Sequence, residues 1–292
     1  MRRLISITIL LFSWCTIITA ANNKIAKDVV KALKSASQEQ RAAILNEASV
    51  AKVGKDDYIT IIKYMNKAKP EIKTDIINWL AAESLIPEKK IIIKDLEIRF
   101  DMPFPTVLKE LLKNKNTEVK RATIKLIANI GDKEYVPALS GLLADEDETI
   151  IQLAESVLIG FEGEVEEFAS RMIPKVGEKG KIAIIEILAI RKANFKVNRI
   201  FDLMKDDNDK VKIAAYKALK DVVKAKDLTF VCGMLESETD PAKTTYLQEA
   251  VIASLLSITD EDERITFLKN RINHAGSDKK GLYDVISEKV SP

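Results

Sequence analysis

The sequence predicts an all-α fold, an α-solenoid of about eight stacked helix pairs, and three observations support this prediction. The 292 residues are 47% hydrophobic, but 10 Gly, 8 Pro and 6% aromatic residues are too few for the many turns of an all-β protein. Apolar residues recur with a period of about 31 residues. Within each period, two apolar series have the spacing of one helix face.

The repeat is clearest in the middle of the chain. Taking Leu112 as an anchor, equivalent apolar residues follow at intervals of 31, 30, 31 and 31: Leu143, Ile173, Met204 and Leu235. A second apolar series begins fourteen residues after the first four of these anchors, beyond a short polar break, with Leu126, Val157, Ile187 and Ala218. Each repeat is therefore predicted to be two antiparallel helices.

Leu33, Met65 and Leu268 extend the pattern toward both ends of the chain. The interval from Met65 to Leu112 is 47, which implies an insertion of about 16 residues between Pro87 and Pro105, where the helical period fails. We therefore expect repeats over 22–85, an irregular insertion at 86–103 and further repeats over 104–292.

Two stretches carry a family resemblance. "VLKELLKNKNTEVKRATIKLIANIGD" and "YVPALSGLLADEDETIIQLAESVLIGF" resemble short HEAT-like repeats in the VPAL start, the acidic turn and the closing Gly-Asp. The resemblance covers residues 25 to 290, and it implies a binding surface more than an activity. The chain also resembles, more weakly, the helical-repeat N-terminal part of larger secreted bacterial proteins that end in a sugar-hydrolase-like module.

Residues 1–21 read as a signal peptide. Arg2 and Arg3 precede an apolar run over 4–18, and Thr19-Ala20-Ala21 provides a small-residue cleavage site. A transmembrane anchor is the alternative, but this run is shorter than the roughly 20 residues that span a bilayer. A lipoprotein signal at Cys15 is disfavoured by bulky Trp14. We expect an exported protein, periplasmic, in the cell envelope or secreted, with no membrane span after cleavage.

Cleavage would leave equal numbers of basic and acidic residues, so nothing draws the chain toward nucleic acid. Cys232 would be the one remaining cysteine, predicted to be buried and inert. His274, the single histidine, is predicted in a solvated turn, which disfavours histidine-based catalysis and zinc sites. The acidic runs at 145–148 and 162–167 fall in predicted turns and helix starts. We expect no enzyme activity and no cofactor.

The stretch "KDDNDKV" at 205–211 has two interpretations. A calcium loop beginning at Asp207 would place Val211 at its fifth position and has no glycine at its sixth. The alternative is an interhelical turn, in which the residue five after each anchor caps the next helix: Thr117, Asp209, Asp240 and Asn273. We therefore predict that Asp209 caps a helix and binds no metal.

Lysines recur at one position of the second helix, eight residues after the anchor. The candidate partner-binding residues are Lys120, Lys181, Lys212 and Lys243, with Ile151 interrupting the series. They would form a ladder for an anionic partner, or they would pair with acids of neighbouring turns such as Asp145, Asp147 and Asp207.

The function that these patterns favour is an exported, non-enzymatic scaffold whose concave surface binds a protein or a neighbouring catalytic module. The alternative is an accessory repeat module of a secreted carbohydrate-processing protein. Exposed aromatic side chains would favour sugar binding, but Trp79 lies fourteen residues after Met65, in a core register.

Overall fold

The computed structural model describes residues 24–51, 53–94, 96, 103–276 and 279–290. In these ranges it contains seventeen α-helices, short 3₁₀ turns and no strand. Sixteen of the helices form eight consecutive pairs, so the predicted all-α solenoid is confirmed. The expected signal peptide at 1–21 lies outside the described residues. The chain divides into two compact units, Met1–Tyr135 and Val136–Pro292.

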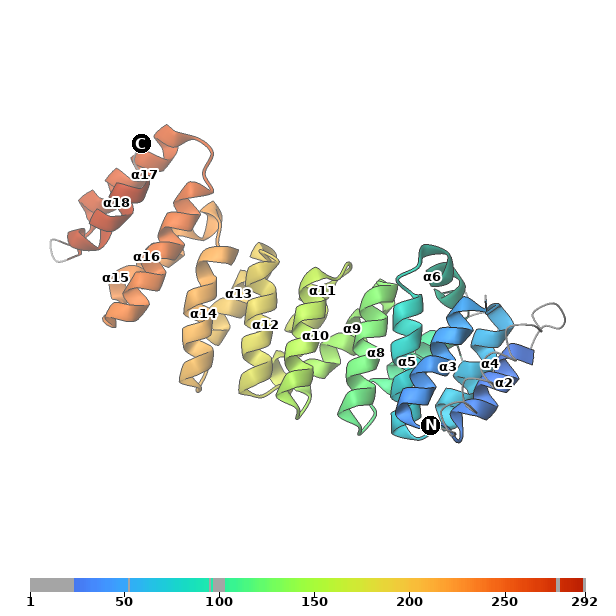
Figure 1. Cartoon of the computed structure of the whole chain (residues 1–292). Coiled ribbons are helices and arrows are strands. Elements are labelled where there is room, and N and C mark those ends of the chain that lie inside the picture. The colour runs from blue at the N-terminus through green and yellow to red at the C-terminus, as the bar shows by residue number, and fades with distance from the viewer. Residues whose placement is uncertain (1–23, 52, 95, 97–102, 277–278, 291–292) are drawn as a thin grey trace, which may run out of the picture. The chain divides into compact units, whose positions relative to one another are not determined.

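The first unit contains three helix pairs and one additional helix (Figure 1). The pairs are α2 (Lys24–Leu33) with α3 (Gln38–Val50), α4 (Lys55–Lys67) with α5 (Pro70–Glu83), and α7 (Phe104–Leu111) with α8 (Thr117–Ile130). The additional helix is α6 (Pro87–Lys94), so the segment expected to be irregular begins as a helix. Pro87 begins α6 because a proline fits the first helical turn.

A buried polar network fastens α6 to the first unit. The Tyr58 hydroxyl donates to Glu83 over 2.5 Å, and the Glu83 carboxylate lies 2.8 Å from the Lys89 ammonium of α6. Lys89 also donates to the Ser49 carbonyl over 3.2 Å. Trp79 is buried and stacks on Tyr58 at 5.3 Å, so its predicted core position is confirmed.

The second unit contains five helix pairs, and Figure 1 shows their second helices side by side. The pairs are α9 (Val136–Gly141) with α10 (Glu148–Gly160), α11 (Val165–Ser170) with α12 (Glu178–Ile190), α13 (Val197–Leu203) with α14 (Asp209–Val222), α15 (Leu228–Ser237) with α16 (Pro241–Leu256), and α17 (Glu261–His274) with α18 (Asp284–Val290). Second helices pack on their neighbours in the order α10, α12, α14, α16 and α18.

The repeat anchors are buried, with one exception. Leu33, Met65, Leu112, Leu143, Met204, Leu235 and Leu268 have at most 6% of their surface exposed. Ile173, in the 3₁₀ turn Ile173–Lys175, is only half-buried. Cys232 is buried as predicted, and burial raises the pKa of its thiol.

Helix capping differs from the sequence prediction at three of four positions. Asp240 caps α16 as expected, accepting from the amides of Ala242 and Lys243. The cap of α14 is Asn208, not Asp209, and the cap of α8 is Asn116, not Thr117. Asn273 lies inside α17 and caps nothing. The turn at 205–211 is confirmed, but an asparagine one residue earlier supplies the capping oxygen.

Gly180 lets α12 approach the preceding repeat closely. A Cβ at this position would lie 2.2 Å from the Leu143 carbonyl oxygen and 2.6 Å from the Val176 Cβ. The equivalent third position after the cap is occupied by a buried β-branched residue in three other second helices: Val119, Ile150 and Val211. The contact between α12 and the turn Leu142–Ala144 therefore requires a residue without a side chain.

We predict that Gly180→Ala destabilises the protein by about 1–3 kcal/mol, because the new methyl group overlaps backbone that cannot move away. Gly233→Ala is the matched control, since a Cβ there meets nothing within 4 Å in α15. The control should raise the free energy of unfolding by about 0.5–1 kcal/mol through helix propensity. Thermal melts followed by circular dichroism test both changes. A Gly180→Ala variant as stable as the wild type would contradict the close approach.

Candidate functional site

The structure places all four candidate lysines near the start of a second helix. Lys120 lies in α8 of the first unit, and the other three lie in α12, α14 and α16 of the second unit. Lys181, Lys212 and Lys243 therefore occupy consecutive packed helices, as the period predicts. Their side chains are between a quarter and a third exposed.

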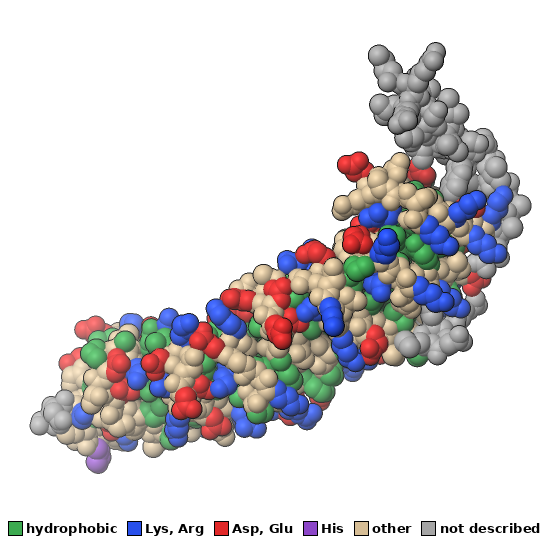
Figure 2. Space-filling model, turned by 90° about the horizontal axis from the view of Figure 1, so that it is seen from below, with side chains coloured by type: hydrophobic (Ala, Val, Ile, Leu, Met, Phe, Trp, Pro, Cys, Tyr) green, Lys and Arg blue, Asp and Glu red, His purple; other side chains and the backbone are tan. Residues whose placement is uncertain are grey.

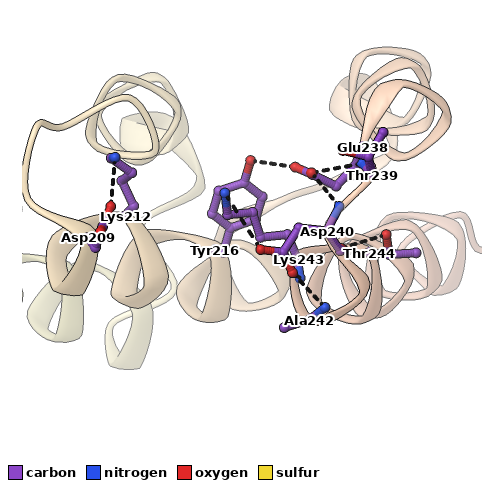
Figure 3. Close-up of polar contacts among 9 residues, drawn as sticks. All are labelled: Asp209, Lys212, Tyr216, Glu238, Thr239, Asp240, Ala242, Lys243 and Thr244. Carbon is purple, nitrogen blue, oxygen red and sulfur yellow. Dashed lines mark hydrogen bonds and ion pairs between the residues drawn. The ribbon is translucent and has the colours of Figure 1, made fainter.

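Each of these three lysines has an acidic partner. The Lys181 ammonium lies 2.5 Å from a carboxylate oxygen of Asp206, in the turn of the next repeat. Lys212 pairs with Asp209 of the same helix at 2.8 Å, and Lys243 lies 4.0 Å from Asp240, the residue that caps its helix (Figure 3). Asp209, the expected cap, thus acts as an ion-pair partner.

Two of these ion pairs lower the pKa of their acidic member, which favours its charged form. The hydrogen bond from Lys181 lowers the pKa of Asp206, and the hydrogen bond from Lys212 lowers the pKa of Asp209. The bond to Asp209 in turn raises the pKa of Lys212. Figure 2 shows acidic and basic side chains interspersed over one face of the molecule, as such pairing requires. The lysines stabilise the turns between helices as well as facing solvent.

An aromatic side chain lies beneath the last lysine, a contact that the sequence analysis missed. The Lys243 ammonium of α16 is 5.6 Å from the centre of the Tyr216 ring of α14. The Tyr216 hydroxyl donates to Glu238 over 3.1 Å (Figure 3). Burial and then this bond raise the pKa of Tyr216 to about 12. The residues are 27 positions apart, so only the stacking of α14 on α16 brings them together.

Two carboxyl groups meet on the neighbouring helices α10 and α12. Glu155 and Glu186 are 31 residues apart and their side chains share a hydrogen bond. Burial, followed by this bond and the charge of Glu186, raises the pKa of Glu155 to about 8. Because a carboxylate can only accept, a hydrogen bond between two carboxyl groups requires a proton on one of them. The 31-residue period could have revealed this pair, because it places the two glutamates at nearly the same position of consecutive second helices.

Other polar features of the described part of the chain are weaker candidates. His274 is exposed and ends α17, not a turn, with Nδ1 2.7 Å from the Asn270 carbonyl. An open pocket of about 400 Å³ lies between α11 and α13, with Arg171, Arg199, Asp202 and Asp206 in its lining. Its charges are mixed, and no three metal-ligating side chains cluster in the described ranges. These ranges also contain no helix long and apolar enough to cross a bilayer.

Comparisons with known proteins concern the fold alone. No family model matches the chain, and no curated protein matches it. Among solved structures, an engineered protein from a structural genomics consortium is 15% identical over 90% of this chain and 78% of its own, with a TM-score of 0.43. A designed armadillo repeat protein in complex with the peptide (KR)4 is also 15% identical, over 92% of this chain and 100% of its own, with a TM-score of 0.33. At these values neither structure assigns a site.

The raised pKa of Glu155 predicts a pH-dependent stability. A folded-state pKa of about 8 lies above the unfolded value of about 4.3, so folding binds a proton between these pH values. The stabilisation is therefore complete below about pH 4 and is lost as the pH rises through 8. Glu155→Gln should melt at a temperature that changes less from pH 5 to pH 8, and higher than the wild type at pH 8.

Glu148→Gln is the matched control for this measurement, because Glu148 is also on α10 but pairs with Lys179 at 3.0 Å. This variant should keep the pH slope of the wild type. Identical slopes for Glu155→Gln and the wild type would show that Glu155 ionises normally in the folded chain.

Proposed function

We propose that the chain is an exported, non-enzymatic, HEAT-like scaffold that binds a protein partner on the second-helix layer of Val136–Pro292. The observation that carries this proposal is the recurrence of exposed side chains at one position of consecutive second helices. Ile182 and Ile213, like Lys181 and Lys212, are 31 residues apart on α12 and α14. A layer built this way offers an extended surface, the usual binding element of helical repeat proteins.

The character of the polar groups favours binding over catalysis. The three lysines of this layer are engaged in ion pairs with Asp206, Asp209 and Asp240, which gives them a structural role in the turns. A partner that approaches them exchanges one ion pair for another, so each lysine contributes little by itself. The three lysines can attract one partner together, because packed helices are about 10 Å apart and this distance is close to the Debye length.

A triple substitution tests the lysines. Lys181→Gln, Lys212→Gln and Lys243→Gln together should reduce capture of the partner from the envelope fraction of the exporting cell, measured by quantitative mass spectrometry. Glutamine removes the charge but stays polar, and it avoids repulsion from Asp206, Asp209 and Asp240. Circular dichroism should show unchanged helical content.

The matched control for the lysines is Lys179→Gln, Lys210→Gln and Lys220→Gln, which removes three ion-paired lysines, one from α12 and two from α14. Capture should persist in this control. Equal capture by wild type, triple variant and control would assign the lysines to the stability of the turns alone.

Export rests on the basic start, apolar run and small-residue end of residues 1–21. Protein recovered from its native host should begin at Ala21 or Asn22, as read by N-terminal sequencing. A recovered chain that retains Met1 would overturn the export proposal without affecting the scaffold proposal.

A further inference from the structure

A pocket opens between two first helices of Val136–Pro292, at the point where the repeat period shortens. The interval from Leu143 to Ile173 is 30 residues, whereas the next two intervals are 31. Ile173 is half-buried, although the other repeat anchors are buried. It lines a pocket of about 400 Å³ between α11 and α13, a volume typical of sites for small ligands.

The lining of this pocket combines apolar side chains with two guanidinium groups. Ile173, Pro174 and Leu203 supply the apolar part. Arg171, at the end of α11, and Arg199, on α13, supply the guanidinium groups, and their side chains are 63% and 57% exposed. We call these five residues the arginine pocket. The combination fits a ligand that carries an aliphatic group beside an anion.

Both guanidinium groups of the arginine pocket keep donors for a ligand. Arg171 donates through Nε to Glu167 over 3.0 Å, and Glu167 also pairs with Lys196. Arg199 lies 3.8 Å from Asp202, which is longer than a hydrogen bond. Because a guanidinium has five donors, these contacts leave each arginine able to bind a carboxylate.

Two aspartates also line the pocket, and they are not equivalent. Asp206 is already engaged, since it accepts from the Lys181 ammonium over 2.5 Å and from the Asn208 amide over 3.0 Å. Asp202 is 70% exposed, and its ion pair is the long contact with Arg199. A ligand carboxylate that replaces Asp202 at Arg199 therefore exchanges a long contact for a hydrogen-bonded one.

We propose that the arginine pocket binds the C-terminal residue of a partner protein when that residue is aliphatic. A terminal leucine carries an aliphatic side chain and a carboxylate on one Cα, so it matches both parts of the lining. The carboxylate meets Arg171 and Arg199 in charge-assisted hydrogen bonds, and the side chain covers Ile173 and Leu203. Capture of a terminal carboxylate is a recurring mode of peptide recognition.

This inference rests on the proposed scaffold function and specifies how the partner is held. The pocket adjoins the lysine series, because Asp206 of its lining pairs with Lys181 at the start of α12. A partner that contacts the lysines is therefore close enough to place its terminus in the pocket.

Peptides test the two features of the ligand separately. The probe is fluorescein-labelled Gly-Ser-Gly-Ala-Leu with a free C-terminal carboxylate, and binding to the full chain is measured by anisotropy. One matched peptide ends in leucine amide, and the other ends in serine with a free carboxylate. The leucine acid should bind about fivefold more tightly than either, because each matched peptide lacks either the charge or the aliphatic side chain.

Substitutions of exposed residues test the pocket without removing core side chains. Arg199→Gln should weaken binding of the leucine acid about fivefold, and Asp202→Asn should strengthen it about threefold by removing the competing carboxylate. Lys205→Gln is the matched control, because Lys205 is exposed in the turn after α13 and does not line the pocket. This control should change the affinity less than about twofold.

The outcomes separate this inference from the proposed function. Equal binding of the leucine acid and its amide, or no binding of the acid, overturns the arginine pocket as a site for a terminal carboxylate. Opposite signs for Arg199→Gln and Asp202→Asn would assign the pocket to a cationic group and also overturn it. Competition by N-acetyl-leucine at the affinity of the peptide would assign the pocket to a small aliphatic acid instead. The scaffold proposal fails only if envelope capture retains no partner at all.

Discussion

The structure depends on one constraint, which is that a pair of helices cannot bury both of its apolar sides alone. In the second unit, α12 lies between α10 and α14, and it buries Ile184, Ile187 and Leu188 completely. If α10 or α14 were removed, part of the apolar surface of α12 would face water. Helices of this length are also not stable on their own. Stacking is therefore the source of stability, and it leaves the outer face of each second helix free to vary.

Polar contacts between successive repeats fix the alignment of each repeat on the next. The guanidinium of Arg191, at the end of α12, donates to the carbonyls of Ile159 and Phe161 over 2.9 Å and pairs with Glu166 at 2.7 Å. Carbonyls at the end of α10 are thus satisfied by a side chain from the following repeat. Lys181 and Asp206 connect α12 to the next turn in the same way. These contacts select one alignment among several that the apolar surfaces alone would allow.

Much of the fold could be predicted from the sequence, because a 31-residue period of apolar residues directly reflects stacked helix pairs. The period gave the eight pairs, the buried anchors, Trp79 in the core and the turn at 205–211. It failed where a one-residue shift matters, since Asn208 and Asp209 are both good capping residues and only the backbone decides between them. It also missed α6, whose eight residues are held by Lys89 and the buried Glu83, a long-range contact without a local signal.

The candidate site was predicted less completely, for the same physical reason. Sequence spacing placed three lysines on consecutive helices. Their acidic partners could not be predicted, because a pair such as Lys181 and Asp206 depends on how far a side chain reaches across a turn. The carboxyl pair of Glu155 and Glu186 was hidden among many acids, because only the packing of α10 on α12 brings the two side chains together.

The glycine in α12 makes the repeats of this chain individually distinct. Where three other second helices carry valine or isoleucine, Gly180 admits the Leu143 carbonyl, and Arg191 at the opposite end of the same helix donates to the carbonyls at the end of α10. Both ends of α12 therefore make specific contacts with the preceding repeat. The chain therefore behaves as an ordered series and not as interchangeable modules. A different repeat in the place of α11 and α12 would lose both the fit of Gly180 against Leu143 and the bonds of Arg191 to the α10 carbonyls.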